Sequence, residues 1–197
     1  MGDWSMSTLN VTNIKAVDGT SSLSIANSTG VVTTSAGFNN YASASSGGGT
    51  TINPTLTDIP SWANEITVAF FDVSGSSTTD TIHRVAVGGS VITSGYQYTS
   101  SYYQNNTAPS VSDRSSTGDA GFMFYGWTNA ANNFNATLTY TKTGNHKYVV
   151  EGHHYNQGYP AFTMKLCGRI SLSGHISGIS LYNSTNFDGG EVRVLWR

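Results

Sequence analysis

The chain has 197 residues, a mass of 20.9 kDa and a net charge of −2, and only 10% of its residues are charged. Ordinary soluble domains contain about 25% charged residues, so the surface of this protein is expected to be polar but nearly uncharged. The low charge excludes a basic stripe that would neutralise phosphates, and we expect no nucleic-acid partner.

Residues 1–50 contain few apolar side chains and end in a Ser/Gly-rich stretch over residues 43–49. Segments so short and so sparse in apolar residues do not fold alone, and this composition is typical of a flexible linker. We therefore predict an extended N-terminal arm and linker over residues 1–50, which docks on a larger assembly or intertwines with neighbouring subunits. A disordered tail is the alternative. The candidate docking residues are Trp4, Leu9, Val11 and Ile14.

From residue 51 onward, apolar residues recur at every second position, and β-branched and aromatic residues fill the runs. This period of two predicts strands rather than helices. The strongest candidates are 66–73, 122–127, 135–142, 162–170 and 191–197, and the weaker ones are 81–87, 91–98, 146–153 and 175–182. Turns rich in Gly, Asn and Asp separate them. The pattern predicts an all-β fold, an antiparallel β-sandwich of the jelly-roll type over residues 51–197.

Three aromatic residues of these strands, Phe122, Phe124 and Trp196, are predicted to lie in the core. The single cysteine, Cys167, excludes an intramolecular disulfide, and its place in a predicted strand favours a half-buried packing role. No run of the chain reaches the roughly 20 apolar residues that span a bilayer. The N-terminus also lacks a signal-peptide pattern. We therefore expect no membrane insertion.

The sharpest cluster of polar residues is His153-His154, with Glu151 before it and His146 further upstream. On a strand, Glu151 and His153 share one face while His154 points to the other, so the three do not converge as metal ligands. The few acidic residues flank turns and strand ends, where a carboxylate has a local structural role. We predict no metal site, no cofactor and no catalytic residues. The chain is expected not to be an enzyme.

Tyrosines are in excess, and several lie among Ser, Asn and Gln residues. Tyrosine rings and amide groups suit stacking on sugars and hydrogen bonding to their hydroxyls, although tyrosine is also an ordinary strand and interface residue. The candidate glycan-contact residues are Tyr96, Tyr98, Tyr102, Tyr103, Tyr155 and Tyr159.

Two stretches of the chain resemble structural proteins of marine bacteriophages, and of cyanophages in particular. The first stretch comprises Met6–Ile14, Asp18-Gly19-Thr20 and Leu23–Gly30, and the second comprises Ile176–Tyr182, Asn186–Gly190 and Val192–Val194. The resemblance implies a tail fibre, head fibre or other virion appendage, generally trimeric. The chain departs from the pattern in its residues before Met6 and in its Trp196-Arg197 ending.

The residues and the resemblance together favour a non-enzymatic virion protein that is assembled in the host cytoplasm. The expected partners are two further copies of the chain, other tail or capsid proteins, and a host cell-surface glycan. The first hypothesis is a trimeric tail-fibre-type appendage for host adhesion. The alternative is a capsid decoration or head-fibre protein that stabilises the shell, and a carbohydrate-active enzyme or stand-alone lectin is a distant third.

Overall fold

The computed structural model describes residues 13–15, 21–25, 32–34, 41–45, 47–77, 79–105, 110–124, 133–156 and 161–197. All elements within these ranges are strands, and the chain divides into two units, Met1–Asn40 and Tyr41–Arg197. In the first unit, three short antiparallel strands form one sheet in the order β1-β2-β3. Their bounds are Asn13–Lys15 (β1), Ser21–Ile25 (β2) and Val32–Thr34 (β3).

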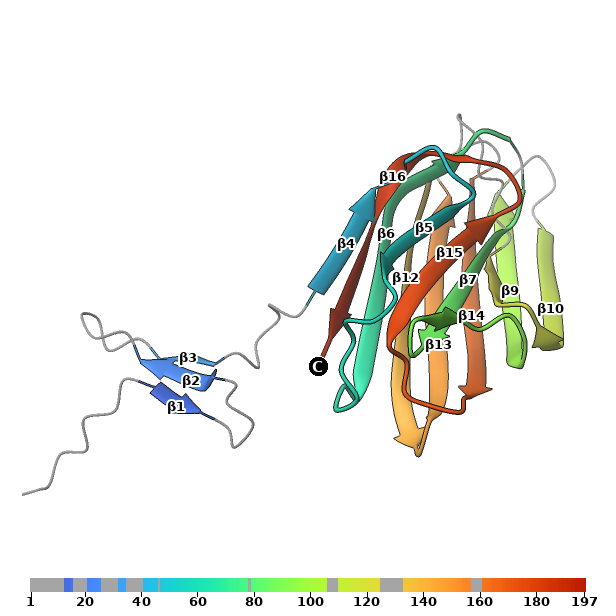
Figure 1. Ribbon diagram of the computed structural model, residues 1–197. Helices are drawn as coiled ribbons and strands as arrows, with labels where there is room; N and C mark the ends of the chain where they lie inside the picture. The colour runs from blue at the N-terminus through green and yellow to red at the C-terminus, as the bar shows by residue number, and fades with distance from the viewer. Residues whose placement is uncertain are drawn as a thin grey trace, which may run out of the picture. The chain divides into compact units, whose positions relative to one another are not determined.

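The second unit is a sandwich of an eight-stranded sheet and a five-stranded sheet (Figure 1), here called the large and the small sheet. The large sheet contains β4 (Tyr41–Ser45), β6 (Glu65–Gly75), β9 (Tyr96–Asn105), β10 (Ser110–Asp119), β12 (Phe134–Gly144), β13 (Lys147–Asn156), β14 (Ala161–Ser171) and β16 (Phe187–Trp196). The small sheet contains β5 (Thr51–Thr55), β7 (Thr81–Val87), β8 (Ser90–Val91), β11 (Phe122–Phe124) and β15 (Gly178–Asn183).

Eight of these strands have the connectivity of a jelly roll. Taken in chain order they are β4, β5, β6, β7, β11, β12, β15 and β16, and they pair as β4-β16-β6-β12 in the large sheet and β5-β15-β7-β11 in the small sheet. The first strand of each set therefore lies beside the last, which is the nested arrangement of two Greek keys. The antiparallel sandwich predicted from the sequence is thus confirmed.

Two inserted hairpins widen the large sheet beyond the jelly roll. The strands β13 and β14 follow β12, and β9 and β10 complete the sheet in the order β12-β13-β14-β9-β10. The extension creates a broad outer face on which alternate residues of each strand face away from the small sheet.

The inward faces of the two sheets enclose one core, to which Val68, Leu138 and Tyr140 of the large sheet and Val85 and Leu181 of the small sheet contribute. Each such side chain stabilises the fold by about 1.5–3 kcal/mol through removal of apolar surface from water. The predicted core residues Phe122 and Phe124 are buried, and Trp196 packs against the core while partly exposed.

The predicted strand over 81–87 coincides with β7, but the one over 91–98 is wrong. The chain leaves β8 at Val91 and re-enters a strand only at Tyr96. The hydroxyl of Tyr96 accepts a hydrogen bond from the Val85 amide at 2.9 Å and donates one to the Ile92 carbonyl at 3.0 Å. This buried side chain therefore stabilises the turn between the two sheets.

The boundary between the units lies at residues 40 and 41, earlier than the predicted boundary at residue 50. Residues 43–45, predicted as linker, belong to β4, which pairs with β16 at the edge of the large sheet. Backbone pairing with a well-packed neighbour holds this strand, although its Ser and Ala side chains supply little apolar surface.

Candidate functional site

The outer face of the large sheet carries three exposed aromatic rings in one line across the strands. Tyr155 of β13 lies beside Thr163 of β14, which lies beside Tyr103 of β9. On its other side Tyr155 is paired with Asn135 of β12, and Asn135 contacts the segment of β6 that contains Phe71. Phe71 is 66% exposed, Tyr155 49% and Tyr103 47%. The aromatic row is defined here as Phe71, Asn135, Tyr155, Thr163 and Tyr103.

A β-bulge positions Phe71. The pairing between β6 and β12 shifts where Phe71 and Asp72 lie opposite the single residue Asn135. Asp72 has a φ of 50°, a left-handed conformation that a bulge residue adopts at a cost. The Asn135 side chain compensates, because its Oδ1 accepts a hydrogen bond from the Asp72 amide at 3.1 Å and its Nδ2 donates to the Asp72 carboxylate at 3.3 Å.

A second irregularity lies on the other side of Phe71, in β16. The pairing of β16 with β6 shifts around Gly189 and Gly190 before Glu191 pairs with Phe71. Gly190 has a φ of 97°, and a Cβ atom there would lie 2.4 Å from the Cα of Val73. Only glycine fits so close to the bulge of β6, so Gly190 fixes the strand that flanks the exposed ring.

A polar row runs parallel to the aromatic row, two residues further along each strand. It is defined here as Arg193, Ala69, Thr137, His153, Lys165 and Ser101, in strand order from β16 to β9. Arg193 donates hydrogen bonds to Glu191 at 2.8 and 3.3 Å, and this pair lies beside Phe71 and Ala69. Donors and acceptors therefore line the aromatic row along this side.

Residues of both rows, from Arg193 on β16 to Thr163 and Lys165 on β14, line an open hollow of about 860 Å³ on the outer face, and the aromatic row continues past it to Tyr103 on β9. Its lining combines the small side chains of Ala69 and Thr137 with the rings of Phe71 and Tyr155 and the long side chains of Lys165 and Arg193. A concave surface with apolar rings and a few polar groups is the usual form of a ligand site in proteins. The hollow is thus the candidate functional site.

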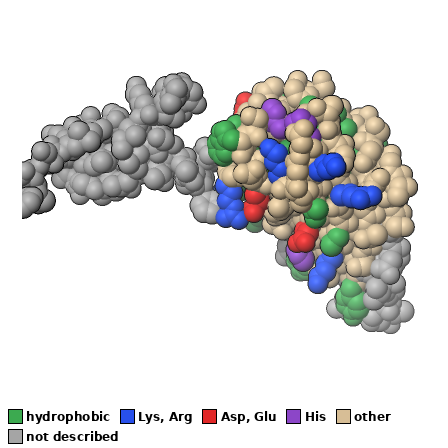
Figure 2. Space-filling view, turned by 90° about the horizontal axis from the view of Figure 1, so that it is seen from below, with side chains coloured by type: hydrophobic (Ala, Val, Ile, Leu, Met, Phe, Trp, Pro, Cys, Tyr) green, Lys and Arg blue, Asp and Glu red, His purple; other side chains and the backbone are tan. Residues whose placement is uncertain are grey.

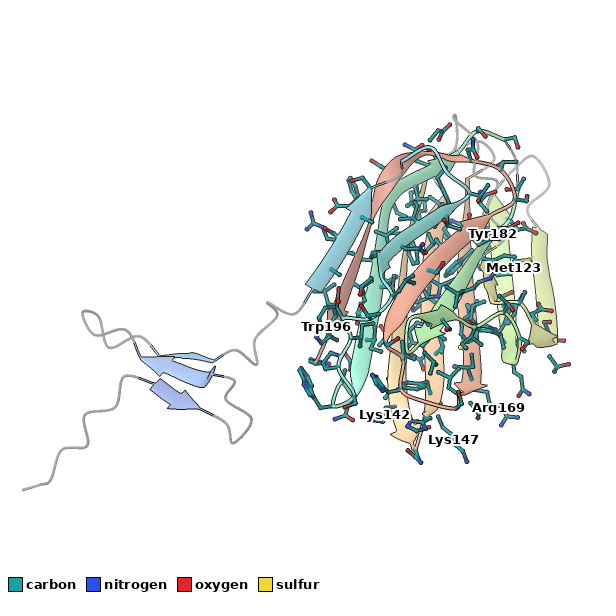
Figure 3. The ribbon with its side chains drawn as sticks, in the orientation of Figure 1. Met123, Lys142, Lys147, Arg169, Tyr182 and Trp196 are labelled. Atoms are coloured by element: carbon teal, nitrogen blue, oxygen red, sulfur yellow. The ribbon has the colours of Figure 1, made fainter. Side chains whose placement is uncertain are left out.

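Three cationic side chains lie at the opposite end of the large sheet from the hollow. Lys142, Lys147 and Arg169 lie at the lower end of the sandwich, around the hairpin between β12 and β13 (Figure 3). Seen from below, the Lys and Arg side chains are scattered over a mostly uncharged polar surface and do not gather into one patch (Figure 2). Scattered cations do not provide the continuous track that a nucleic-acid backbone requires.

The structure separates the six tyrosines that the sequence predicted as glycan contacts. Tyr103 and Tyr155 belong to the aromatic row and are exposed. Tyr96 and Tyr98 are wrong as contact residues, because they face inward from β9 and are buried. Their rings pack against Phe122, and the Tyr98 hydroxyl donates to Asp119 at 3.0 Å. The Tyr102 side chain and all of Tyr159 lie outside the described residues.

Phe71, Lys165 and the Glu191–Arg193 pair line the hollow and were not among the predicted site residues. Strand alternation contains the signal for Phe71, since Phe70 faces the core and its neighbour must then face outward. The convergence of β6 and β16 at this point depends on strand order, which a local sequence pattern does not contain.

The histidines lie as the alternation predicted, with His153 exposed and His154 buried on opposite faces of β13. Glu151 shares the outer face with His153, and His146 lies in the hairpin turn with a φ of 55°. Among the described residues, no group of three or more His, Cys, Asp or Glu side chains is placed to bind a metal ion.

The largest pKa shifts belong to side chains of the core rather than to the hollow. Burial lowers the pKa of His83 and of His154 to about 3, and burial raises the pKa of Tyr96 to about 12 and that of Tyr140 well above its usual value. At the edge of the hollow, the hydrogen bond from Arg193 lowers the pKa of Glu191. The Glu191 carboxylate is therefore ionised at neutral pH.

The remaining predicted residues lie away from the hollow or outside the described part of the chain. Cys167 is exposed on the outer face between Glu151 and Thr99, and not half-buried, because it alternates with the inward Leu166. Ile14 lies in β1 opposite Leu23. Trp4, Leu9 and Val11, the other predicted docking residues, lie outside the described residues.

No helix among the described residues has the length and hydropathy needed to cross a bilayer. Comparison of the chain with known protein families, with curated proteins and with solved structures found no match. The function is therefore inferred from the residues and geometry of the chain itself.

Proposed function

We propose that this chain is a non-enzymatic structural component of a bacteriophage virion, a trimeric tail-fibre-type appendage that adheres to glycan on the host surface. The observation that carries the proposal is the hollow between the aromatic row and the polar row. Exposed rings of Phe71 and Tyr155 stand beside polar groups of Asn135, Arg193 and Glu191. A sugar ring presents apolar C–H faces for stacking and hydroxyls at its rim for hydrogen bonding, so this combination suits a glycan.

The virion part of the proposal is supported by the sequence resemblance to marine phage structural proteins and by the jelly-roll topology. Jelly rolls recur in viral capsid and lectin domains, which is an analogy at the level of the fold. The division of the chain into two units also suits an appendage, in which one part attaches and the other projects.

The trimeric part is supported by the size of the first unit. Its strands have three, five and three residues, which is too little to bury an independent core. Contacts with other copies would supply the missing burial. Three copies also present three hollows, and their combined avidity compensates for the weak binding of each one.

The carboxylates of the outer face support a site that binds without catalysis. Glycosidases require a pair of acids about 5–9.5 Å apart, one of them with a raised pKa. Glu191 and Glu151 are three strands and four residues along the strand apart, which places their Cα atoms about 20 Å from each other. The pKa of Glu191 is lowered, and its carboxylate is held by Arg193 along its own strand.

The test is a binding comparison with the labelled full-length chain. One sample is a panel of marine cyanobacterial cells, and the other is a set of expanded capsids from marine phages that lack their decoration proteins. Binding to cells and not to capsids is expected. Binding to capsids alone would replace the adhesion role by shell decoration, and binding to neither would contradict a virion role on both counts.

A further inference from the structure

The aromatic row alternates rings with polar side chains in strand order: Phe71, Asn135, Tyr155, Thr163, Tyr103. Each ring is two strands from the next. Strands in a sheet are about 4.8 Å apart, so neighbouring rings are about 10 Å apart and the row extends about 19 Å. This distance between neighbouring rings is close to the length of a disaccharide unit.

The polar groups between the rings retain hydrogen-bonding capacity. Asn135 uses one amide hydrogen and one lone pair of its oxygen on Asp72, which leaves a second amide hydrogen and a second lone pair. Thr163 is exposed between Tyr155 and Tyr103 and has a hydroxyl. Each interval between rings therefore offers a polar group to the rim of a stacked ligand.

A protein partner fits this surface less well than a sugar chain does. The centre of a protein interface is a contiguous apolar patch with few charged residues. Here the apolar rings lie in single file, and the polar row with Arg193, His153 and Lys165 runs directly beside them. The surface thus matches a ligand one ring wide with polar groups along its edge.

A single-stranded nucleic acid would also stack on a row of aromatic rings, but its phosphates require a positively charged groove. Arg193 is paired with Glu191, and Glu151 is exposed on the same face next to the polar row. The net charge of the whole chain is −2. The charges of this face therefore favour an uncharged, hydroxyl-rich chain.

The next inference rests on the proposed function. It concerns the class of the ligand and the direction in which the ligand crosses the large sheet. We infer that the outer face of the large sheet binds an extended oligosaccharide that lies across the strands, with every second sugar stacked in turn on Phe71, Tyr155 and Tyr103. A site of this kind recognises several internal units of a polysaccharide and not a single terminal sugar.

The experiment uses the full-length chain on a printed array of bacterial surface polysaccharides, followed by calorimetric titration with oligosaccharides of increasing length from any polysaccharide that binds. We expect affinity to rise with length until the chain spans the aromatic row. Phe71→Ala, Tyr155→Ala and Tyr103→Ala should each weaken binding roughly tenfold, since each removes one stacked ring.

Val149→Ala is the matched control, because Val149 is exposed on the same face of the same strand as Tyr155 but outside the row. It should leave affinity unchanged. Full affinity for a monosaccharide, or row variants that bind normally, would overturn the inference. Row variants that change only the solution mass would show the row to be a subunit contact, which also overturns it.

The failure of this inference differs from the failure of the proposed function. If the chain binds cells but no polysaccharide on the array, the extended-glycan site is wrong while an adhesion role stands. If the chain binds neither cells nor capsids, the proposed function itself fails.

Discussion

Two histidine rings lie inside the jelly roll, at positions where a charge would be costly. The Nδ1 atom of His83 is 2.6 Å from the hydroxyl of Tyr140, and its ring packs edge-on against Phe70 at 5.6 Å. The ring of His154 packs edge-on against Phe124 at 5.6 Å and Phe134 at 5.2 Å. Burial keeps both rings neutral because it lowers their pKa to about 3.

Stability should consequently fall in acid. The unfolded chain binds protons on these histidines below about pH 6.5, whereas the folded chain does so only near pH 3. The free energy of unfolding therefore decreases as the pH falls through this window, by about 1.4 kcal/mol per pH unit for each histidine, and the histidines contribute no change above it. Denaturant unfolding at pH 7 and at pH 5 should differ by about 4 kcal/mol through these two groups.

His154→Phe should remove about half of this pH-dependent loss, because it keeps an aromatic ring beside Phe124 and Phe134 but has no proton to bind. Val149→Phe is the control on the same strand, since Val149 is exposed, and its replacement adds a ring without removing an ionisable group and should leave the pH dependence unchanged. A His154→Phe variant with the wild-type slope between pH 7 and pH 5 would contradict the role given to this ring.

At the scale of single residues, strand alternation predicted the separation of His153 from His154 and the inward direction of Phe122 and Phe124. The same alternation, applied to β9, would have assigned Tyr96 and Tyr98 to the core and Tyr103 to the outer face. The prediction of all six tyrosines as glycan contacts did not take this alternation into account. The exposure of Phe71 depends in addition on the bulge at Asp72, whose partner Asn135 is 63 residues away in the sequence.

Among the elements, the junction between β6 and β16 has a narrow tolerance for substitution. Gly190→Ala would place a Cβ atom 2.4 Å from Val73 Cα and 2.6 Å from the Asp72 carbonyl oxygen, at a φ of 97°. We expect it to reduce the free energy of unfolding by about 3 kcal/mol, through left-handed strain and overpacking. Chemical denaturation measures the loss directly.

Gly144→Ala is the control for that measurement, because an added Cβ atom there would lie 4.0 Å from the Lys147 side chain. It should change stability by less than about 0.5 kcal/mol. If the two variants were equally stable, the bulge would not depend on glycine at residue 190.

Strands with apolar alternation were predictable as elements, and strands without it were not. Ile66, Val68 and Phe70 mark β6, and Val192 and Val194 mark β16, because their buried faces set the pattern. β4 contains mostly Ser and Ala, half of the β10 residues are Ser or Thr, and these two strands form the edges of the large sheet. These two strands form because their backbones pair with a neighbouring strand. The side-chain pattern does not predict that pairing.

For the whole molecule, the proposed trimer predicts a solution mass of 3 × 20.9 kDa = 62.7 kDa. Light scattering on the full-length chain at micromolar concentration measures it. The expected cause is association of the first unit, whose described strands have only three, five and three residues. A mass of 20.9 kDa at micromolar concentrations would contradict a trimer that forms in solution before attachment to the virion.

The fold class of the whole molecule followed from the sequence, since one-sided alternation and frequent turns suffice to specify an antiparallel sandwich. Of the candidate site, only Tyr103 and Tyr155 were predicted from the sequence. Its hollow depends on Ala69 and Thr137 lying side by side between longer side chains, and strand order alone brings those residues together.

Adhesion to glycan is tested most directly by binding of the labelled full-length chain to cyanobacterial cells before and after mild periodate oxidation, which cleaves the vicinal diols of surface sugars. We predict that periodate abolishes binding, while digestion of surface proteins with a protease leaves it intact. Binding that survives periodate and is lost after protease treatment would contradict a glycan receptor and assign the outer face of the large sheet to a protein.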